Sequence, residues 1–379
     1  MPPYRIALVG TGGIAAIHAE NVARLDGRAE LVAVCDIDAE RLGAFADRWS
    51  VPGRHQDLAS LLAEERPDLV HLCTPPGLHI DQAIECLEAG VDVLVEKPPA
   101  LSLADFDRLD SASRASGASV ACLFQHRFGD AAIAVSNLIE DRTWGRPLVA
   151  QCSTLWYRPY DYFDLPWRGT WAAEGGGPTM GHGIHQFDLL LHLLGPWSEV
   201  TAVAARLARP VATEDVSAAL VRFENGAVAT VINSLLSPRQ TSAIRIDTEH
   251  ATIELDHLYG YSTADWTLTP APGSEELVAA HWDPAALTGG SGHAAQFRAV
   301  LDAKDAGRPL PVTQAEGRAT LEFAAALYAS AFTGATVARG EIVPGHPFYD
   351  GMDGHGAGDT ALARTALAGA PASHDKDAR

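Results

Sequence analysis

The first third of the chain alternates apolar runs with stretches of helical spacing. Over residues 4–125 the runs YRIALVG, ELVAVCD, PDLVHLCTP and VDVLVEKP hold few polar positions, as expected for strands buried on both faces. The stretches between them, such as IAAIHAENVARL and AERLGAFADRW, carry apolar residues at helical intervals. This alternation predicts a doubly wound α/β domain with a parallel sheet over residues 1–125.

The pattern changes after about residue 129. The runs DVSAALVRF, AVATVINSLL, SAIRIDT and ATIELDH follow one another without helices between them, and Asn225-Gly226 marks a turn. Such strands pair antiparallel, which predicts an α+β domain with a large, mostly antiparallel open sheet over residues 126–349. Half-polar alternation predicts that one sheet face packs on helices. We expect the other face to meet a second subunit, in a homodimer or homotetramer, rather than water.

Composition adds limits to this picture. The chain has 379 residues, 47% of them hydrophobic, and 28 Lys and Arg against 48 Asp and Glu give a net charge of −20. That charge argues against nucleic acid and membrane surfaces as partners. Five cysteines without paired spacing, no signal peptide and no apolar span of about 18 residues lead us to expect a cytoplasmic protein. Residues 350–379 lack periodicity and are expected to form a flexible tail.

The first apolar run ends in a GxGxxA turn that opens a helix. Gly10 permits the tight turn, Gly12 lets a pyrophosphate approach the backbone, and the small Ala15 allows close packing of helix on strand. This arrangement is typical of a Rossmann dinucleotide-binding domain. The turn residues expected to line the cofactor are Gly10, Thr11, Gly12, Gly13 and Ile14.

The second run ends at Asp36, about where an acid meets the adenosine ribose. A carboxylate there accepts a hydrogen bond from the 2′-hydroxyl and repels a 2′-phosphate, so we expect NAD in preference to NADP. Arg41 lies too far along the next helix to reverse this expectation. The alternative is that Asp36 only caps that helix while the glycines shape a loop.

Two later segments follow strands of the predicted parallel sheet. Thr74 and Pro75, with His79, come after the third long run, and Glu96 and Lys97 end the run VDVLVEKP. Open parallel sheets bind ligands at the carboxyl ends of their strands. We therefore expect all five residues at the cofactor site.

The segments GTGGIA, CTPPGLH, EKPPA and GGGPTMGHGIHQFD occur in this order, and with them the chain resembles the Gfo/Idh/MocA oxidoreductases over roughly residues 4–343. The resemblance implies that Lys97 lies beside the nicotinamide and the substrate hydroxyl, where an ammonium group could orient the alcohol and stabilise a developing alkoxide. The alternative for Lys97 is a solvated side chain in a loop.

The family's second motif, Asp-x-Gly-x-His-x-x-Asp, aligns with residues 181–188. The alignment makes His185 the implied base, since an imidazole with a pKa of roughly 6.5 suits proton transfer. Gly181 stands in place of the usual aspartate. His182 could supply the missing polar group, although neighbouring helical positions point about 100° apart. The alternatives are a helix-terminal role for His182 and a core role for His185. No metal is expected, because His182, His185 and His192 lack the HExxH pattern.

Aromatic and arginine residues gather in the run WYRPYDYFDLPWRGTW, directly before the glycine stretch. Aromatic faces beside fixed donors suit a sugar, and the alternative for each residue is a packing or subunit contact. The residues expected at the substrate are Arg127, Trp156, Arg158, Trp167, Arg168, Trp171 and His182.

These features predict an NAD-dependent oxidoreductase that transfers a hydride between nicotinamide and a secondary alcohol of a sugar, polyol or sugar derivative. One alternative keeps NAD bound and recycles it to assist glycoside hydrolysis or elimination, and Gly181 gives it some support. Another is a dinucleotide-binding regulatory protein, against which Lys97 and His185 argue.

Overall fold

A computed structural model describes residues 2–165 and 167–365, and the chain divides into two compact units. Unit 1 comprises Met1–Ala100, Ala104–Gln125 and His293–Arg318. Unit 2 comprises Leu101–Leu103, His126–Gly292 and the chain from Ala319 onward. The expected boundaries, 1–125 and 126–349, place residues 293–318 in the second domain, whereas the structure assigns them to unit 1.

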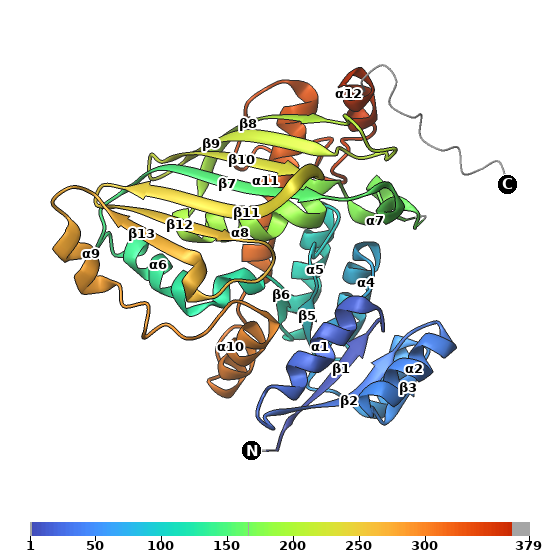
Figure 1. Ribbon diagram of the computed structural model, residues 1–379. Coiled ribbons are helices and arrows are strands. Elements are labelled where there is room, and N and C mark those ends of the chain that lie inside the picture. Colours follow the sequence, from blue (N-terminus) through green and yellow to red (C-terminus); the bar gives the residue numbers. More distant parts are fainter. Residues whose placement is uncertain (1, 166, 366–379) are drawn as a thin grey trace. The chain divides into compact units, whose positions relative to one another are not determined.

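Unit 1 contains, within the described residues, a six-stranded parallel sheet in the order β3-β2-β1-β4-β5-β6 (Figure 1). This order is that of a doubly wound nucleotide-binding fold, so the predicted fold class is confirmed. The strands are β1 (Tyr4–Val9), β2 (Ala29–Cys35), β3 (Gly53–His55), β4 (Leu69–Leu72), β5 (Asp92–Val95) and β6 (Val120–Cys122). The helices are α1 (Gly13–Ala23), α2 (Ala39–Trp49), α3 (Leu58–Glu65), η1 (Pro76–Leu78), α4 (His79–Glu88), α5 (Leu103–Ser116) and α10 (His293–Asp305).

Helix α10 belongs to unit 1 because its apolar side chains complete the core of that unit. Phe297, Val300 and Leu301 are buried with residues of β1 and α1, and α10 packs against α1. Burying three such side chains contributes roughly 1.5–3 kcal/mol each. The helical pattern of this segment was visible in the sequence, but the partner of its apolar face was not.

Unit 2 is built on an eight-stranded sheet in the order β13-β12-β11-β7-β10-β9-β8-β14. Among the described strands β7 and β10 pair parallel and the other neighbours pair antiparallel, so the expected sheet is confirmed. The strands are β7 (Pro147–Tyr157), β8 (Trp197–Ala205), β9 (Val216–Phe223), β10 (Val228–Ser234), β11 (Leu236–Thr248), β12 (Ala251–His257), β13 (Trp266–Pro270) and β14 (Val337–Ala338).

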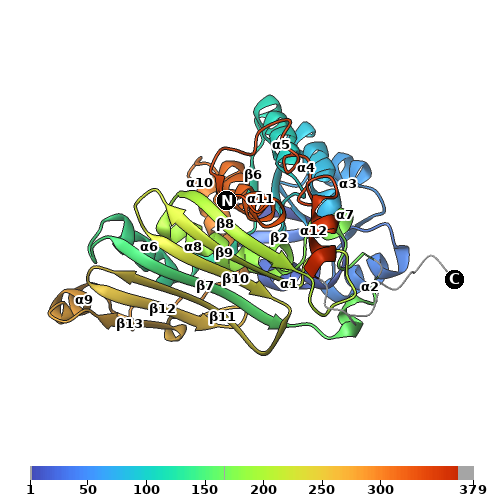
Figure 2. The ribbon, with the colours of Figure 1, turned by 90° about the horizontal axis from the view of Figure 1, so that it is seen from above.

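Helices of unit 2 cover one face of this sheet, with α8 packed against β7 and β11 (Figure 2). On the other face Val149, Val203, Leu220 and Ile232 are exposed. The second subunit expected on this face stays a prediction. The helices are η2 (Gln125–Phe128), α6 (Asp130–Glu140), η3 (Tyr160–Phe163), α7 (Trp171–Glu174), the π-helix η4 (Thr179–Gly183), α8 (Ile184–Leu194), η5 (Thr263–Asp265), α9 (Glu275–His281), α11 (Gln314–Thr333) and α12 (Ala357–Thr365).

The carboxyl-terminal segment differs from the expected flexible tail over residues 350–365. Helix α12 packs against β8, and the side chains of Met352 and Leu362 are buried. The burial of these two apolar side chains could not be predicted from the Gly- and Ala-rich composition of the segment. The rest of the expected tail, 366–379, lies outside the described residues. Of the described helices, none has the length and apolar character that crossing a membrane requires.

Candidate active site

The glycine turn between β1 and α1 is shaped for an anionic group. Gly10 has a φ of +89°, and a Cβ atom there would lie 2.9 Å from the carbonyl carbon and oxygen of Cys73, so only glycine fits. A Cβ atom on Gly12 or Gly13 would meet no atom within 4 Å. Helix α1 has no side-chain cap and no acid in its first turn. Its first N–H groups therefore face open space, as the pyrophosphate of a dinucleotide requires.

Asp36, at the end of β2, is fixed by donors on both carboxylate oxygens. Oδ2 accepts hydrogen bonds from the Thr11 backbone (2.8 Å), the Thr11 hydroxyl (2.7 Å) and Arg41 Nε (3.0 Å). Oδ1 accepts from Arg41 Nη2 (2.5 Å) and the Asp38 backbone (3.0 Å). Burial alone would raise the pKa of Asp36, but the Arg41 guanidinium and the neighbouring N–H groups outweigh it and hold that pKa well below its usual range.

This geometry changes two expectations about the ribose end. Asp38, not Asp36, is the N-cap of α2, because its side chain accepts from the backbone of Glu40 and Arg41. Arg41 was expected to lie too far along the helix to matter, yet its side chain reaches back to Asp36. The Asp36 carboxylate is thus saturated, and a ribose hydroxyl can bind it only in place of one of these donors.

His79 links the two loops at the carboxyl ends of β4 and β5. It is buried, with Nδ1 3.0 Å from the Pro98 carbonyl oxygen and Nε2 2.8 Å from that of Thr74. Burial lowers its pKa. Thr74 in turn donates to Gln82 (2.6 Å), and Pro75 is exposed. His79 therefore holds the expected cofactor loops together rather than facing a ligand itself.

Glu96, immediately before Lys97, lies in a buried network that the sequence did not indicate. Its Oε1 accepts from His18 Nε2 (2.9 Å) and His293 Nε2 (3.3 Å), and its Oε2 accepts from the Lys97 backbone (3.0 Å). A carboxylate can only accept, so His18 donates through Nε2, and its Nδ1 accepts from His71 Nδ1 at 3.0 Å. The network ties α1, α10 and β4 to the backbone beside Lys97.

The network also has a defined charge state. Burial raises the pKa of Glu96, but the bonds from the two histidines outweigh it and hold that pKa well below its usual value. Burial lowers the pKa of His18 more than Glu96 raises it. His18, Glu96 and His293 place ligand atoms within 4.8 Å of one another, a spacing compatible with a metal ion. Their direct hydrogen bonds give the same atoms partners without one.

In unit 2, His185 lies in the first turn of α8 among other rings. It is 3% exposed, stacks on His126 with ring centroids 5.0 Å apart, and meets the edge of Tyr259 at 5.6 Å. The next residue, Gln186, bonds His257 Nε2 at 2.7 Å. His126, His257 and Tyr259 were not predicted. Their signals were faint: His126 precedes Arg127 in FQHRF, and His257 ends the strand ATIELDH.

His182 lies on η4, whose π geometry overrides the spacing of an ordinary helix. Its ring meets Trp156 at 4.9 Å and Tyr162 at 6.2 Å. Trp156 donates from Nε1 to the Ser242 hydroxyl at 3.0 Å. A Cβ atom on Gly181 would meet nothing within 4 Å. The place of the family's aspartate is therefore open space, while His182 faces the aromatic segment.

The predicted substrate residues of unit 2 fall into different environments. Arg158 lies over Trp156 at 4.7 Å, and Arg168 lies over Tyr162 at 4.1 Å and over Trp167 at 4.3 Å. Arg168 is also paired with Glu174 at 3.2 Å. By contrast, Trp171 packs against Tyr328 at 5.3 Å and Phe332 at 5.9 Å, which is a packing contact.

Arg127 differs from its expected contact with a ligand. It is buried and forms a bidentate ion pair with Asp188, with Nε–Oδ2 and Nη2–Oδ1 distances of 2.8 and 2.6 Å. Thr320 also donates to Asp188 at 2.7 Å. This fork-to-fork geometry commits the guanidinium to the interior of unit 2, so Arg127 supports α8 rather than a substrate.

Neighbouring residues of the protein leave no room for a side chain at two of the glycines before α8. A Cβ atom on Gly177 would lie 1.9 Å from the Glu214 carbonyl oxygen, and one on Gly183 would lie 2.0 Å from Asn233 Oδ1. Buried Glu214 accepts from the Gly177 and Thr179 backbone at 2.9 and 3.1 Å. The close approach that the glycine stretch predicts is therefore an approach to the segment before β9 and to β10.

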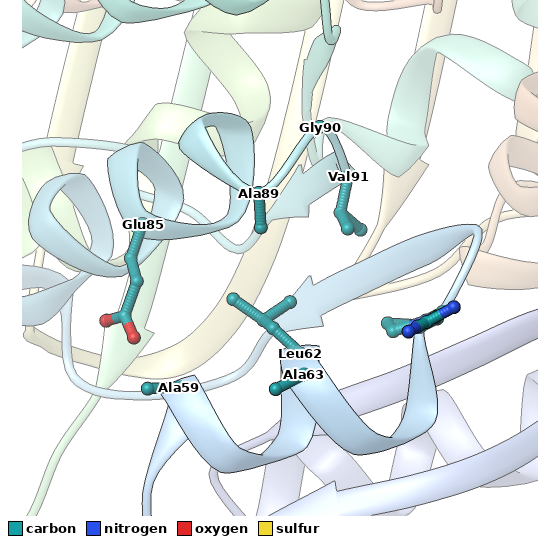
Figure 3. Close-up of a pocket in the computed structure, with 9 residues that line it drawn as sticks. Ala59, Leu62, Ala63, Glu85, Ala89, Gly90 and Val91 are labelled. Carbon is teal, nitrogen blue, oxygen red and sulfur yellow. The ribbon is translucent and has the colours of Figure 1, made fainter.

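A separate pocket of about 710 Å³ lies between α3 and α4 of unit 1 (Figure 3). Leu62 and Ala63 line it from α3, and Ala89 and Val91 line it beside β5. Gly90 and Val91 precede β5, so this pocket opens at the amino ends of the strands. Parallel sheets of this type bind ligands at the opposite ends, and the predicted site residues lie elsewhere.

Comparison with known proteins agrees with this geometry. Residues 4–124 match a family model described as "Oxidoreductase family, NAD-binding Rossmann fold", and residues 133–254 match the GFO/IDH/MocA C-terminal domain. The D-glucoside 3-dehydrogenase of Escherichia coli is 26% identical over 88% of this chain and 97% of its own.

Two solved structures are similar over nearly their full length. The WlbA dehydrogenase of Chromobacterium violaceum, in complex with NADH and UDP-GlcNAcA, is 31% identical with a TM-score of 0.78, covering 89% of this chain and 96% of its own. The WlbA dehydrogenase of Bordetella pertussis, with the same two ligands, is 30% identical with a TM-score of 0.77, covering 89% and 97%. The chain therefore belongs to the Gfo/Idh/MocA family of NAD-binding oxidoreductases, and it is a dehydrogenase.

Proposed function

We propose that this dehydrogenase oxidises a secondary hydroxyl group of a sugar, polyol or sugar derivative, with NAD as the acceptor. Two relatives support a carbohydrate: one is named a D-glucoside 3-dehydrogenase, and one was solved with UDP-GlcNAcA. The observation that carries the proposal is the buried imidazole of His185, which contacts the rings of His126 and Tyr259 at the start of α8. A buried, ring-flanked imidazole is suited to taking a proton from a hydroxyl group.

The proposed roles divide between the two units. NAD, when bound, supplies the nicotinamide that takes up the hydrogen and the electron pair from the oxidised carbon. His185 takes the hydroxyl proton, and the Lys97 ammonium orients the hydroxyl oxygen and offsets its developing negative charge. The contact between the Lys97 backbone and Glu96 fixes the start of the segment that carries this ammonium.

The buried polar atoms of unit 2 support a ligand with several hydroxyl groups. Gln186 Oε1 and Thr154 Oγ1 are buried and have no hydrogen-bond partner among the described residues. Leaving such atoms unmet costs about 1–3 kcal/mol each. Sugar hydroxyls would satisfy them, while Trp156 and Tyr259 offer ring faces for sugar C–H groups.

The test is NADH formation at 340 nm with a panel of sugars, polyols and glycosides. We expect at least one to reduce NAD, and His185→Ala to lower kcat by about 100- to 10,000-fold, the range of general base catalysis, with NAD affinity unchanged. His281→Ala, which removes an exposed imidazole of the same unit, should keep full activity. A panel without any NADH, or an active His185→Ala variant, would contradict the proposal.

A second candidate, cofactor-recycling cleavage of a glycoside, is favoured by the open space at Gly181, since the family's aspartate is missing there. It differs from net oxidation in its products: NAD stays bound, no NADH accumulates, and a chromogenic glycoside releases its aglycone. Measuring aglycone and NADH in the same reaction separates the two functions.

A further inference from the structure

Two arginines of unit 2 carry charges that no carboxylate among the described residues offsets. Arg209 is 7% exposed, and its Nε donates to the Arg158 carbonyl oxygen at 2.8 Å. Arg158 donates from Nη1 to the Tyr157 carbonyl oxygen at 3.1 Å, and its buried Nε has no described partner. Nearby Arg168 and Arg127 are paired with Glu174 and Asp188.

Arg209 stands out because it is buried, in a chain with 48 acidic residues and a net charge of −20. Burying a guanidinium group is costly unless an opposite charge or several hydrogen bonds compensate. Ring faces compensate only in part: Arg209 lies over Tyr157 and Tyr160 at 5.3 and 4.8 Å, and Arg158 lies over Trp156 at 4.7 Å. The planar guanidinium fork remains suited to a carboxylate or a phosphate group.

The arginine pair is connected to His185 through rings of the same unit. Arg158 lies over Trp156, the Trp156 and Tyr259 rings are 6.2 Å apart, and Tyr259 meets His185 at 5.6 Å. An anion held by Arg158 would therefore be linked to the proposed base through Trp156 and Tyr259. One molecule with both a negative group and an oxidisable hydroxyl could contact both.

We propose that Arg158, supported by Arg209, forms an anion subsite that binds a carboxylate or phosphate group on the sugar substrate. Arg158 contacts the anion. Arg209 positions Arg158 by donating from Nε to the Arg158 carbonyl oxygen, and it adds positive potential. The inference rests on the proposed function, because it names the class of sugar that this site takes: an anionic one.

The experiment compares three probes of similar ring structure: methyl glucoside, glucuronate and glucose 6-phosphate. Binding to the NAD-loaded full chain is measured by calorimetry, and NADH formation is measured in parallel. We expect one anionic probe to bind about ten- to a hundredfold more tightly than methyl glucoside. The preferred probe identifies the group as carboxylate or phosphate, and added salt should weaken its binding.

Three substitutions test whether the preference for an anionic probe depends on Arg158. Arg158→Gln should remove the preference for the anionic probe over methyl glucoside, and Arg158→Lys should restore part of it. Arg245→Gln removes the same charge from an exposed site of unit 2 that is paired with Asp247, and it should keep the preference. Unfolding temperatures of all variants show that each is folded.

Two outcomes separate this inference from the proposed function. If neutral sugars reduce NAD and Arg158→Gln leaves the ratio of affinities unchanged, the anion subsite is refuted and the oxidoreductase function stands. If anionic probes bind through Arg158 but no probe or sugar panel yields NADH, the subsite stands and the proposed function fails.

Discussion

The carboxyl ends of the unit 1 strands and the group of rings around His185 in unit 2 differ in how their buried polar atoms are satisfied. In unit 1, Asp36 has donors on both oxygens, and Glu96 accepts from two histidines and a backbone amide. In unit 2, Gln186 and Thr154 each keep one buried atom without a described partner. Unit 1 satisfies its two carboxylates with its own contacts, although His71 Nε2 of the Glu96 network is buried without a described partner, whereas unit 2 leaves hydrogen-bonding capacity near His185 that a ligand could use.

The difference fits the division of tasks between the units. A cofactor site serves the same molecule in every reaction cycle, so its groups can be held by neighbours before the cofactor arrives. A substrate site gains specificity from groups that are unmet until the correct ligand binds. Substitutions in unit 1 should therefore cost stability, and substitutions of the unmet groups in unit 2 should mainly cost affinity.

The largest expected effect on stability is that of Glu96→Gln, which opens the network in unit 1. The change keeps the shape but removes the anion that His18 and His293 face, and an amide N–H₂ group replaces one acceptor. We expect the free energy of unfolding to fall by about 1.5–3 kcal/mol, the range for a hydrogen bond to a charged group. Thermal and urea unfolding at pH 7 measure it. Glu64→Gln, at an exposed position of α3, should change it by less than about 0.5 kcal/mol.

The same network predicts a loss of stability in acid. The pKa of Glu96 is lower in the folded chain than its ordinary 4.5, so its contribution is present above that value and is lost as the pH falls through the folded pKa. The pKa of His18 is lowered from 6.5 by burial, so the unfolded chain takes up a proton first and stability falls below pH 6.5. The difference between wild type and Glu96→Gln should shrink below about pH 4.5. A constant difference down to pH 3 would contradict this assignment.

A smaller effect is expected at the ribose end of unit 1. Asp36→Ser removes the acid and leaves the Arg41 guanidinium with the longer contact to Asp38 (3.4 Å), so that it can turn toward a 2′-phosphate. We expect the Kd for NAD to rise about ten- to a hundredfold and the Kd for NADP to fall. Both constants are measured by calorimetry. The double variant Asp36→Ser/Arg41→Gln should lose the gain for NADP, and unchanged NAD affinity in Asp36→Ser would exclude the assignment of this acid.

The sequence was informative where contacts are local. Gly10, Gly12 and Asp36 could be predicted because one strand, one turn and the next strand bring them together. The Glu96 network could not, since it joins residues 78 and 197 positions apart. The ion pair of Arg127 could not be foreseen for the same reason: its partner, Asp188, lies 61 positions away on α8. Pairing of distant polar groups depends on packing that periodicity does not encode.

The smallest expected effect compares an unmet with a satisfied hydroxyl inside unit 2, on facing residues of β7 and β11. Thr154 and Ser242 are register partners in unit 2. The Thr154 hydroxyl has no described partner, whereas the Ser242 hydroxyl accepts from Trp156 and donates to the Leu258 carbonyl oxygen. Thr154→Val should leave the free energy of unfolding unchanged or raise it by up to about 1 kcal/mol, because an unmet buried hydroxyl is removed, while KM rises. Ser242→Ala should lower it by about 1–2 kcal/mol. Equal losses in urea unfolding would show that the Thr154 hydroxyl is already satisfied within the protein.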